Sequence, residues 1–237
     1  MAMLLGSVGM LWAQKPDKDG YYTGSEVDES ALGLGFSVSP YYSNRRLLSN
    51  TLNPGQAFQL IDNATEGQWG LGFGPEVYIA LSDRFEVVTG VQWGTAGFRY
   101  PRVELENVIL GLDSGFYALT EEFQFVNVPI GLAFRSQLND EWYLDVTPAI
   151  ELSWLTKYDL IYEAGGVVET SDALPLAEDF FSWLSLTIGG TYSPFETWGY
   201  SVRFGGRYML NSLIQRSDYP REVLYTIGGS VGVQYRF

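Results

Sequence analysis

Residues 142–155 read WYLDVTPAIELSWL. Almost every second position is bulky and apolar: Trp142, Leu144, Val146, Ile150, Leu152 and Trp154. The positions between them are mostly small or charged and include Asp145 and Glu151. A period of two places successive side chains on opposite faces of a β-strand. The stretch therefore predicts a strand with one apolar and one polar face.

The same alternation recurs on both sides of this stretch. Seven further runs show it, at residues 31–42, 68–82, 85–99, 122–135, 180–192, 198–210 and 222–237. Their connections alternate between long (43–67, 100–121, 156–179, 211–221) and short (83–84, 136–141, 193–197). Short turns at one end and long loops at the other are typical of outer-membrane barrels, with periplasmic turns and extracellular loops. The sequence therefore predicts an all-β fold, an eight-stranded antiparallel up-and-down transmembrane β-barrel. Residues 160–162 and 167–168, around Gly165 and Gly166, are expected to continue one hairpin beyond the membrane.

Glycine and tryptophan indicate which face of each strand looks inward. Glycines gather on the polar face, which suits the crowded interior of a small barrel. Trp69, Trp142, Trp154 and Trp198 lie on the apolar face near strand ends, where an aromatic girdle would meet lipid headgroups. We therefore expect the apolar side chains to face hydrocarbon and the polar ones to face the lumen, the reverse of a soluble lipocalin-like barrel.

The lumen-facing positions carry balanced charge. They form an expected lumenal ion-pair network of Glu76, Glu86, Asp145, Glu151, Arg135, Arg203, Arg207 and Arg236. Residue counting puts Arg203, Glu76 and Asp145 at similar heights in mid-barrel, with Arg207 and Glu151 higher. A buried charge without a partner is costly, so mutual compensation is required. The network is interpreted as a structural plug in a lumen too narrow for a water-filled channel.

The first 13 residues, MAMLLGSVGMLWA, are apolar and are followed by a polar stretch. They resemble the hydrophobic part of a secretory signal peptide cleaved after Ala13, although a buried N-terminal helix or strand remains an alternative. Residues 14–30 are predicted to be a flexible periplasmic lead-in, and residues 31–237 to be the barrel domain. No stretch approaches the ~20 apolar residues that a transmembrane helix needs.

Composition narrows the chemistry. The chain has no cysteine and no histidine, which excludes disulfides, thiolate chemistry and imidazole-assisted catalysis. We expect no catalytic residue, no cofactor and no metal site, and we do not expect an enzyme. The net charge of -14 would repel phosphate backbones, so nucleic acid is not an expected partner.

The predicted long loops are rich in acidic residues. Two interpretations are open: a solvated, repulsive rim, or binding of divalent cations, although the spacing of a calcium loop is absent. In the first loop, Arg45 and Arg46 could contact lipid phosphates or be solvated. The acidic residues concerned are Glu104, Glu106, Asp113, Glu121, Glu122, Asp159, Glu163, Glu169, Asp172, Glu178 and Asp179.

The chain ends VGVQYRF, an alternating strand closed by an aromatic residue. Val233, Tyr235 and Phe237 are expected to form the assembly signal that barrel-assembly machinery recognises. The run FVNVPIGL at 125–132 resembles the fourth strand of the PorT-like outer-membrane β-barrel family of Bacteroidota, although Asn127 stands where that family commonly has Glu. The end of the leader, Trp12-Ala13-Gln14, is similar to signal peptides in that group. The resemblance implies an outer-membrane location and eight strands, and no shared activity.

The favoured interpretation is a non-catalytic structural or interaction barrel in outer-membrane lipid. Its plugged polar lumen would anchor acidic extracellular loops that contact an envelope protein or glycan. Two alternatives remain open at this stage: a small-solute transport or ligand-binding barrel, and a soluble lipocalin-like binder.

Overall fold

The computed structural model describes most of the predicted barrel domain. The described residues are 15–16, 22–23, 32–48, 65–105, 115–164, 167–174, 177–195, 197–213 and 221–237. The predicted signal peptide and most of the predicted lead-in lie outside them. In the lead-in, β1 (Lys15–Pro16) and β2 (Tyr22–Thr23) pair antiparallel. The described part of the chain holds no helix long and apolar enough to cross a membrane.

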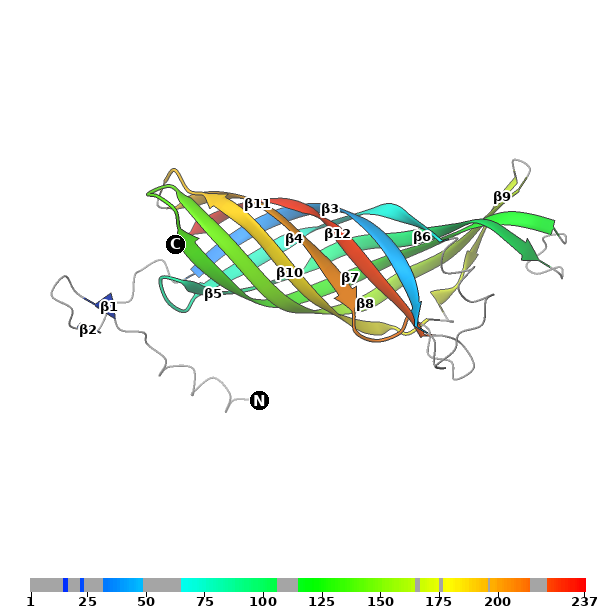
Figure 1. The fold of residues 1–237 in the computed structure, drawn as a ribbon, viewed down its shortest axis with the longest axis horizontal. Coiled ribbons are helices and arrows are strands. Elements are labelled where there is room, and N and C mark those ends of the chain that lie inside the picture. Colours follow the sequence, from blue (N-terminus) through cyan, green and yellow to red (C-terminus); the bar gives the residue numbers. More distant parts are fainter. Residues whose placement is uncertain are drawn as a thin grey trace.

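One antiparallel sheet of ten strands closes on itself (Figure 1). The first and last strands of the sheet in sequence, β3 and β12, pair with each other, and β7 pairs with β8. The strands are β3 (Leu32–Leu48), β4 (Glu66–Ala80), β5 (Phe85–Gly90), β6 (Gln92–Leu105), β7 (Gly115–Gln137), β8 (Trp142–Ala164), β9 (Val167–Asp172), β10 (Phe180–Tyr192), β11 (Trp198–Met209) and β12 (Arg221–Arg236).

The predicted antiparallel barrel is confirmed, but the sheet has ten strands where eight were expected. Val91 interrupts the run predicted over 85–99, and β5 and β6 each pair with both β4 and β7, so together they take one place in the ring. Among the described strands, β9 pairs only with β8 and continues the expected hairpin around residues 165–166. The ring itself therefore has eight places.

Several strands run further than predicted toward the end that carries the long loops. The strand β3 continues to Leu48, β6 to Leu105 and β8 to Ala164, so parts of the expected loops are strand. Figure 1 shows β6, β7, β8 and β9 projecting beyond the rest of the barrel wall at this end. We call it the long-loop end and the opposite one the short-turn end. The extensions escaped prediction because outward residues in them, such as Arg46 and Glu163, are polar and exposed, which removes the apolar half of the alternation.

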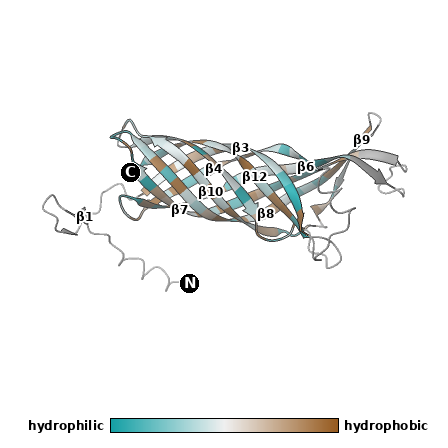
Figure 2. Cartoon of the chain, in the orientation of Figure 1, coloured by the Kyte–Doolittle hydropathy of each residue, from teal (hydrophilic) through white to brown (hydrophobic). Residues whose placement is uncertain are grey.

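The outside of the barrel is apolar across its middle. Trp69 is 77% exposed, Phe204 67% and Val231 56%. Figure 2 shows hydrophobic segments crossing the barrel wall. Aromatic pairs mark both margins: Trp142 packs on Tyr192 at the short-turn end, with ring centroids 5.0 Å apart, and Trp154 packs on Phe180 at the other margin, 5.4 Å apart.

We call the outward-facing surface between these margins the apolar belt. At ~3.4 Å per residue and a strand tilt of ~40°, Trp142 and Trp154 of β8 are roughly 30 Å apart along the barrel axis, close to the thickness of a bilayer's hydrocarbon core. The predicted orientation of the two faces is confirmed, because the bulky apolar side chains are on the outer surface while Glu76 and Asp145 are buried within.

The interior corrects one expectation, because it is not polar throughout. Near the long-loop end, inward-facing rings form what we call the aromatic core: Tyr41, Phe98, Phe123, Phe125, Phe181 and Trp183, packed with apolar neighbours such as Met209 and Leu224. Phe125 lies on the same face of β7 as the polar Asn127, so the inner face changes from polar to aromatic along one strand. Gly94 makes room for this packing, since a Cβ there would come within 2.6 Å of the Phe125 ring.

Candidate functional site: the lumen and the long-loop end

The lumen near the short-turn end is filled by a cluster of charges around Arg135. Its guanidinium contacts Asp145 at 3.0 Å and Glu86 at 3.3 Å. Arg236 reaches the other oxygen of Glu86 at 2.9 Å, and the Thr191 hydroxyl donates to Asp145. All side chains of this cluster except Arg236 are at least nine-tenths buried. Two cations thus compensate two carboxylates where water has little access.

A second cluster lies in mid-barrel around Glu76. Arg203 contacts this carboxylate at 3.4 Å and donates to the Tyr78 hydroxyl at 3.2 Å, and Tyr78 in turn donates to Glu76. Ser37 donates to Glu76 at 2.7 Å and Gln92 at 3.1 Å. The carboxylate therefore has donors from four different strands, and the cluster ties opposite parts of the wall together.

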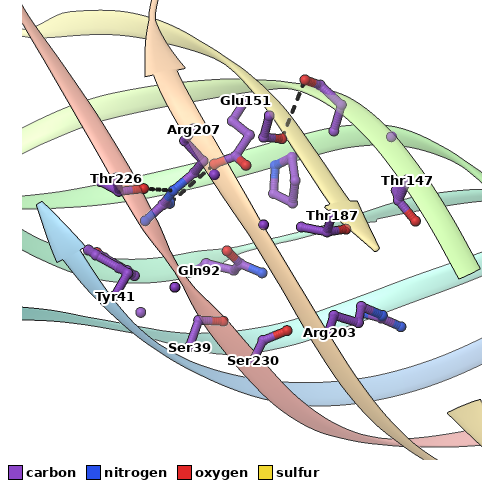
Figure 3. Close-up of a pocket in the computed structure, with 18 of the residues that line it drawn as sticks. Ser39, Tyr41, Gln92, Thr147, Glu151, Thr187, Arg203, Arg207, Thr226 and Ser230 are labelled. Atoms are coloured by element: carbon purple, nitrogen blue, oxygen red, sulfur yellow. Dashed lines mark hydrogen bonds and ion pairs between the residues drawn. The ribbon is translucent and has the colours of Figure 1, made fainter. Parts of the chain in front are cut away.

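The third cluster joins the charged lumen to the aromatic core. Arg207 contacts Glu151 at 3.3 Å and donates to Thr226 at 3.2 Å (Figure 3). Its guanidinium lies 4.4 Å from the centroid of the Tyr41 ring, within cation–π range. Asn127 donates to Glu151 at 2.6 Å. A chain of hydrogen bonds then runs from Trp183 through Ser153 to Asn127.

The structure thus places all eight residues of the expected lumenal network inside the barrel, in three groups. Arg203 meets Glu76, and Arg207 meets Glu151. The similar heights predicted for Asp145 and Arg203 hold, because both lie opposite Gly189 of β10. Asp145 nevertheless pairs with Arg135, its direct cross-strand neighbour on β7, because β10 separates it from Arg203.

Between the Arg203 and Arg207 groups lies a cavity of about 120 Å³. Figure 3 shows side chains from several strands pointing into it. Its walls are mostly glycines and short hydroxyl side chains, such as Ser39, Thr187 and Ser230. Toward the long-loop end it meets the aromatic core, whose Phe125 and Trp183 are 2% and 0% exposed. The cavity can hold several waters, but buried side chains close the lumen on both sides of it.

The sequence did not indicate a further buried charge cluster. It lies on the long-loop side of the aromatic core, outside the apolar belt. Arg45 contacts Glu222 at 2.6 Å, and its guanidinium lies 4.4 Å from the centroid of the Tyr100 ring. Arg45 had been expected in a loop, as a lipid-phosphate ligand or a solvated side chain, and this expectation is wrong. Because β3 continues to Leu48, Arg45 occupies an inward position and is 7% exposed.

Glu121 belongs to the same region and corrects the expectation of a fully solvated acidic rim. It is 7% exposed and accepts a hydrogen bond of 2.5 Å from the Tyr158 hydroxyl. Burial, and then repulsion from Glu222, raise the pKa of Glu121 to about 8. Asp159 is also buried, beside Lys157 at 2.5 Å. The burial of Glu121 could have been predicted from the alternation along β7, because Glu121 lies two residues before the inward-facing Phe123 and so shares its face.

Most of the remaining acidic residues of the expected rim are exposed. These are Glu122, Glu163, Glu169, Asp172 and Asp179, whereas Glu178 is half-buried. Glu106, Asp113 and the side chain of Glu104 lie outside the described part of the chain. Within the described residues, no group of three or more carboxylates is placed to hold a metal ion.

Buried Glu121 makes the stability of the long-loop end depend on pH. Between its ordinary pKa of 4.5 and about 8, folded Glu121 keeps a proton that the unfolded chain releases. The free energy of unfolding should therefore fall as pH rises through this window, by a few kcal/mol at ~1.4 kcal/mol per pKa unit. We expect Glu121→Gln to remove this fall, measured as the difference in urea unfolding between pH 5 and pH 9 in micelles. Glu122→Gln, at the exposed neighbouring position, is the control. Equal pH dependence of unfolding in the parent and both variants would contradict the raised pKa of Glu121.

The residues of the expected assembly signal lie on the outer face of the last strand. Phe237 is 58% exposed, and its backbone amide donates to the Leu32 carbonyl at 3.1 Å. Tyr235 packs on Trp198, with ring centroids 5.1 Å apart. These positions join the chain's last residues to its first barrel strand, and their recognition by assembly machinery remains a prediction.

No protein-family model and no curated protein sequence matches this chain. Among solved structures, the chain is similar to the attachment invasion locus protein Ail of Yersinia pestis, with 14% identity, 86% of this chain and 98% of that chain covered, and a TM-score of 0.34. It is also similar to Neisserial surface protein A (10% identity, 87% and 96% covered, TM-score 0.39). A third is the outer membrane protease OmpT from Escherichia coli (12% identity, 98% and 100% covered, TM-score 0.48). At these identities and scores, the similarities assign no family and no activity to the chain.

Proposed function

We propose that this protein is a non-catalytic β-barrel of the outer membrane whose lumen is closed and whose extracellular long-loop end presents an interaction surface. The observation that carries the proposal is the inverted distribution of side chains. Trp69, Phe204 and Ile227 are more than 60% exposed, while the charged side chains Glu76 and Asp145 are buried. Such a surface suits lipid hydrocarbon and would aggregate in water.

The closed lumen supports an anchoring role over the two alternatives. A solute crossing the barrel would have to displace both the buried Arg135 cluster and the aromatic core. A lipocalin-like binder of an apolar ligand would need a cavity free of charges, whereas two ion pairs, Arg203–Glu76 and Arg207–Glu151, line the lumenal cavity. Neither transport through the lumen nor binding of an apolar ligand inside it fits this packing.

The orientation in the membrane, the assembly route and the family belong to the same proposal. The long-loop end would lie outside the cell, and the short turns and the N-terminus in the periplasm, as in other outer-membrane barrels. Val233, Tyr235 and Phe237 would be read by barrel-assembly machinery. Membership of the PorT-like family rests on the resemblances at residues 125–132 and at Trp12-Ala13-Gln14.

Two measurements test the proposed function, one on cells that produce the protein and one on the refolded protein. We expect the chain to fractionate with outer membranes and to resist extraction by alkaline carbonate. In planar bilayers we expect no stepwise conductance. Steady ohmic channels from the unmodified protein would contradict the closed lumen, and recovery in the aqueous fraction without detergent would contradict the membrane location.

A further inference from the structure

Among the residues that the structure describes, the projecting sheet at the long-loop end has an unpaired edge, which we call the open edge. Beyond the apolar belt, β7, β8 and β9 continue as a sheet in which β9 is the terminal strand. Among the described residues, β9 has β8 as its single strand partner, and Figure 1 shows it at the far end of the projection. Val167 and Val168 of β9 are each 60% exposed. Open edges of this kind are usually blunted by proline, by charged side chains or by a covering segment. The strand β9, VVETSD, contains no proline or lysine, and its charged side chains are the acidic Glu169 and Asp172.

The pairing pattern shows which backbone groups of β9 are available. The amide of Ala173 donates to the Tyr158 carbonyl at 2.8 Å. Hydrogen-bonded and non-hydrogen-bonded pairs alternate along an antiparallel ladder. Residues 169 and 171 therefore bond to β8, and the amide and carbonyl groups of Val168, Thr170 and Asp172 point toward the open edge.

The side chains beside this edge are acidic. Glu122, Asp159 and Asp172 are direct cross-strand neighbours on β7, β8 and β9. Lys157 pairs with Asp159 and Arg99 with Glu163. Within the described part of the chain, Glu122 and Asp172 have no ion pair of their own, and the three carboxylates share the positive charge of one lysine, Lys157. Like charges in a cross-strand row repel one another, and a cation placed next in the row would relieve the repulsion.

We propose that β9 binds an extended, lysine- or arginine-rich segment of another protein by strand addition. The added strand would bond to the free backbone groups of Val168, Thr170 and Asp172, and a basic side chain opposite Asp172 would continue the row of charges. A second copy of this chain fits poorly, because it would bring a second acidic edge against the first. The inference rests on the proposed function in one respect, which is that the long-loop end is accessible from outside.

The test uses the full chain refolded in detergent micelles and two capped peptides, one alternating lysine with valine and one alternating glutamate with valine. We expect the lysine peptide to bind and the glutamate peptide not to bind, by fluorescence anisotropy. Thr170→Pro removes an edge amide without removing a bond to β8, and edge strands tolerate proline. It should weaken binding roughly tenfold, equivalent to one backbone hydrogen bond, whereas Thr170→Ala should leave binding unchanged.

A second variant keeps the inference testable if Thr170→Pro disturbs the hairpin. Asp172→Asn retains the oxygen that accepts from the Leu174 amide, but removes the charge, so it should weaken lysine-peptide binding severalfold and reduce its salt dependence. Equal binding of both peptides, no binding of either, or concentration-dependent dimers that Thr170→Pro abolishes would each overturn the inference. Membrane fractionation and conductance test the proposed function separately. If the protein is a non-conducting membrane barrel but does not bind the lysine peptide, the strand-addition proposal is contradicted and the proposed function is not.

Discussion

An Arg135→Leu variant is expected to lose about 3–5 kcal/mol of unfolding free energy. Arg135 is the shared partner of Asp145 and Glu86, and all three side chains are less than 10% exposed. Without the guanidinium, Asp145 keeps the hydrogen bond from the Thr191 hydroxyl but loses its ion pair. Glu86 then has Arg236 as its one remaining ion-pair partner among the described residues. The loss can be measured by urea unfolding in micelles, followed through tryptophan fluorescence.

Arg99→Leu is the matched control, because it breaks an ion pair of the same chemistry on an exposed surface. The side chains of Arg99 and Glu163 are 40% and 55% exposed. Exposed pairs contribute about 0–1 kcal/mol, so this variant should unfold nearly as the parent does. Similar losses for the two variants would mean that the lumenal charges are hydrated, and the plug interpretation would be wrong.

The second large effect is expected from Trp183→Ala. Trp183 is fully buried in the aromatic core, packs against Phe125 and Phe181, and donates to the Ser153 hydroxyl at 3.0 Å. Truncation leaves a cavity that the barrel wall cannot collapse to fill, which costs about 3–5 kcal/mol. Urea unfolding under the conditions used for Arg135→Leu measures the loss.

Trp69→Ala is the control, since it removes the same ring from the outer surface, where Trp69 is 77% exposed. Lipid or detergent can occupy the space, so no cavity forms and the loss should be much smaller. A larger loss from Trp69→Ala than from Trp183→Ala would contradict the assignment of inside and outside.

The sequence predicted the barrel and the inward face of each strand because both follow from the alternation of side chains along a strand. Alternation fixes which residues share a face, and the glycines and tryptophans then distinguish the inner face from the outer one. The charged residues of the lumen, such as Glu76 and Arg203, could be named because they occupy the polar face of clearly alternating runs. The ion-pair partner of each charged residue could not be predicted, because the alternation does not show which inward-facing side chain on another strand lies nearest.

The long-loop end was predicted less well, for a physical reason. Beyond the apolar belt, outward residues are no longer apolar, so the alternation that marks a strand fades while the backbone pairing continues. Arg45 and Glu121 consequently had the appearance of loop residues, although both are buried. The aromatic core was not predicted, because Phe123 and Phe125 are apolar although they face inward. In the sequence they cannot be told apart from the apolar residues of the outer face.

Because the sequence contains no cysteine, single cysteines can be introduced to test which face of each strand looks outward. Single substitutions Val231→Cys and Ser230→Cys place a nitroxide label at adjacent positions of β12, one 56% exposed on the outer face and one lining the lumenal cavity. In lipid vesicles, the label at 231 should collide freely with oxygen dissolved in the hydrocarbon and rarely with a water-soluble nickel chelate, and the label at 230 should be shielded from both. A label at 230 that meets oxygen in the hydrocarbon while the label at 231 is shielded would contradict the account.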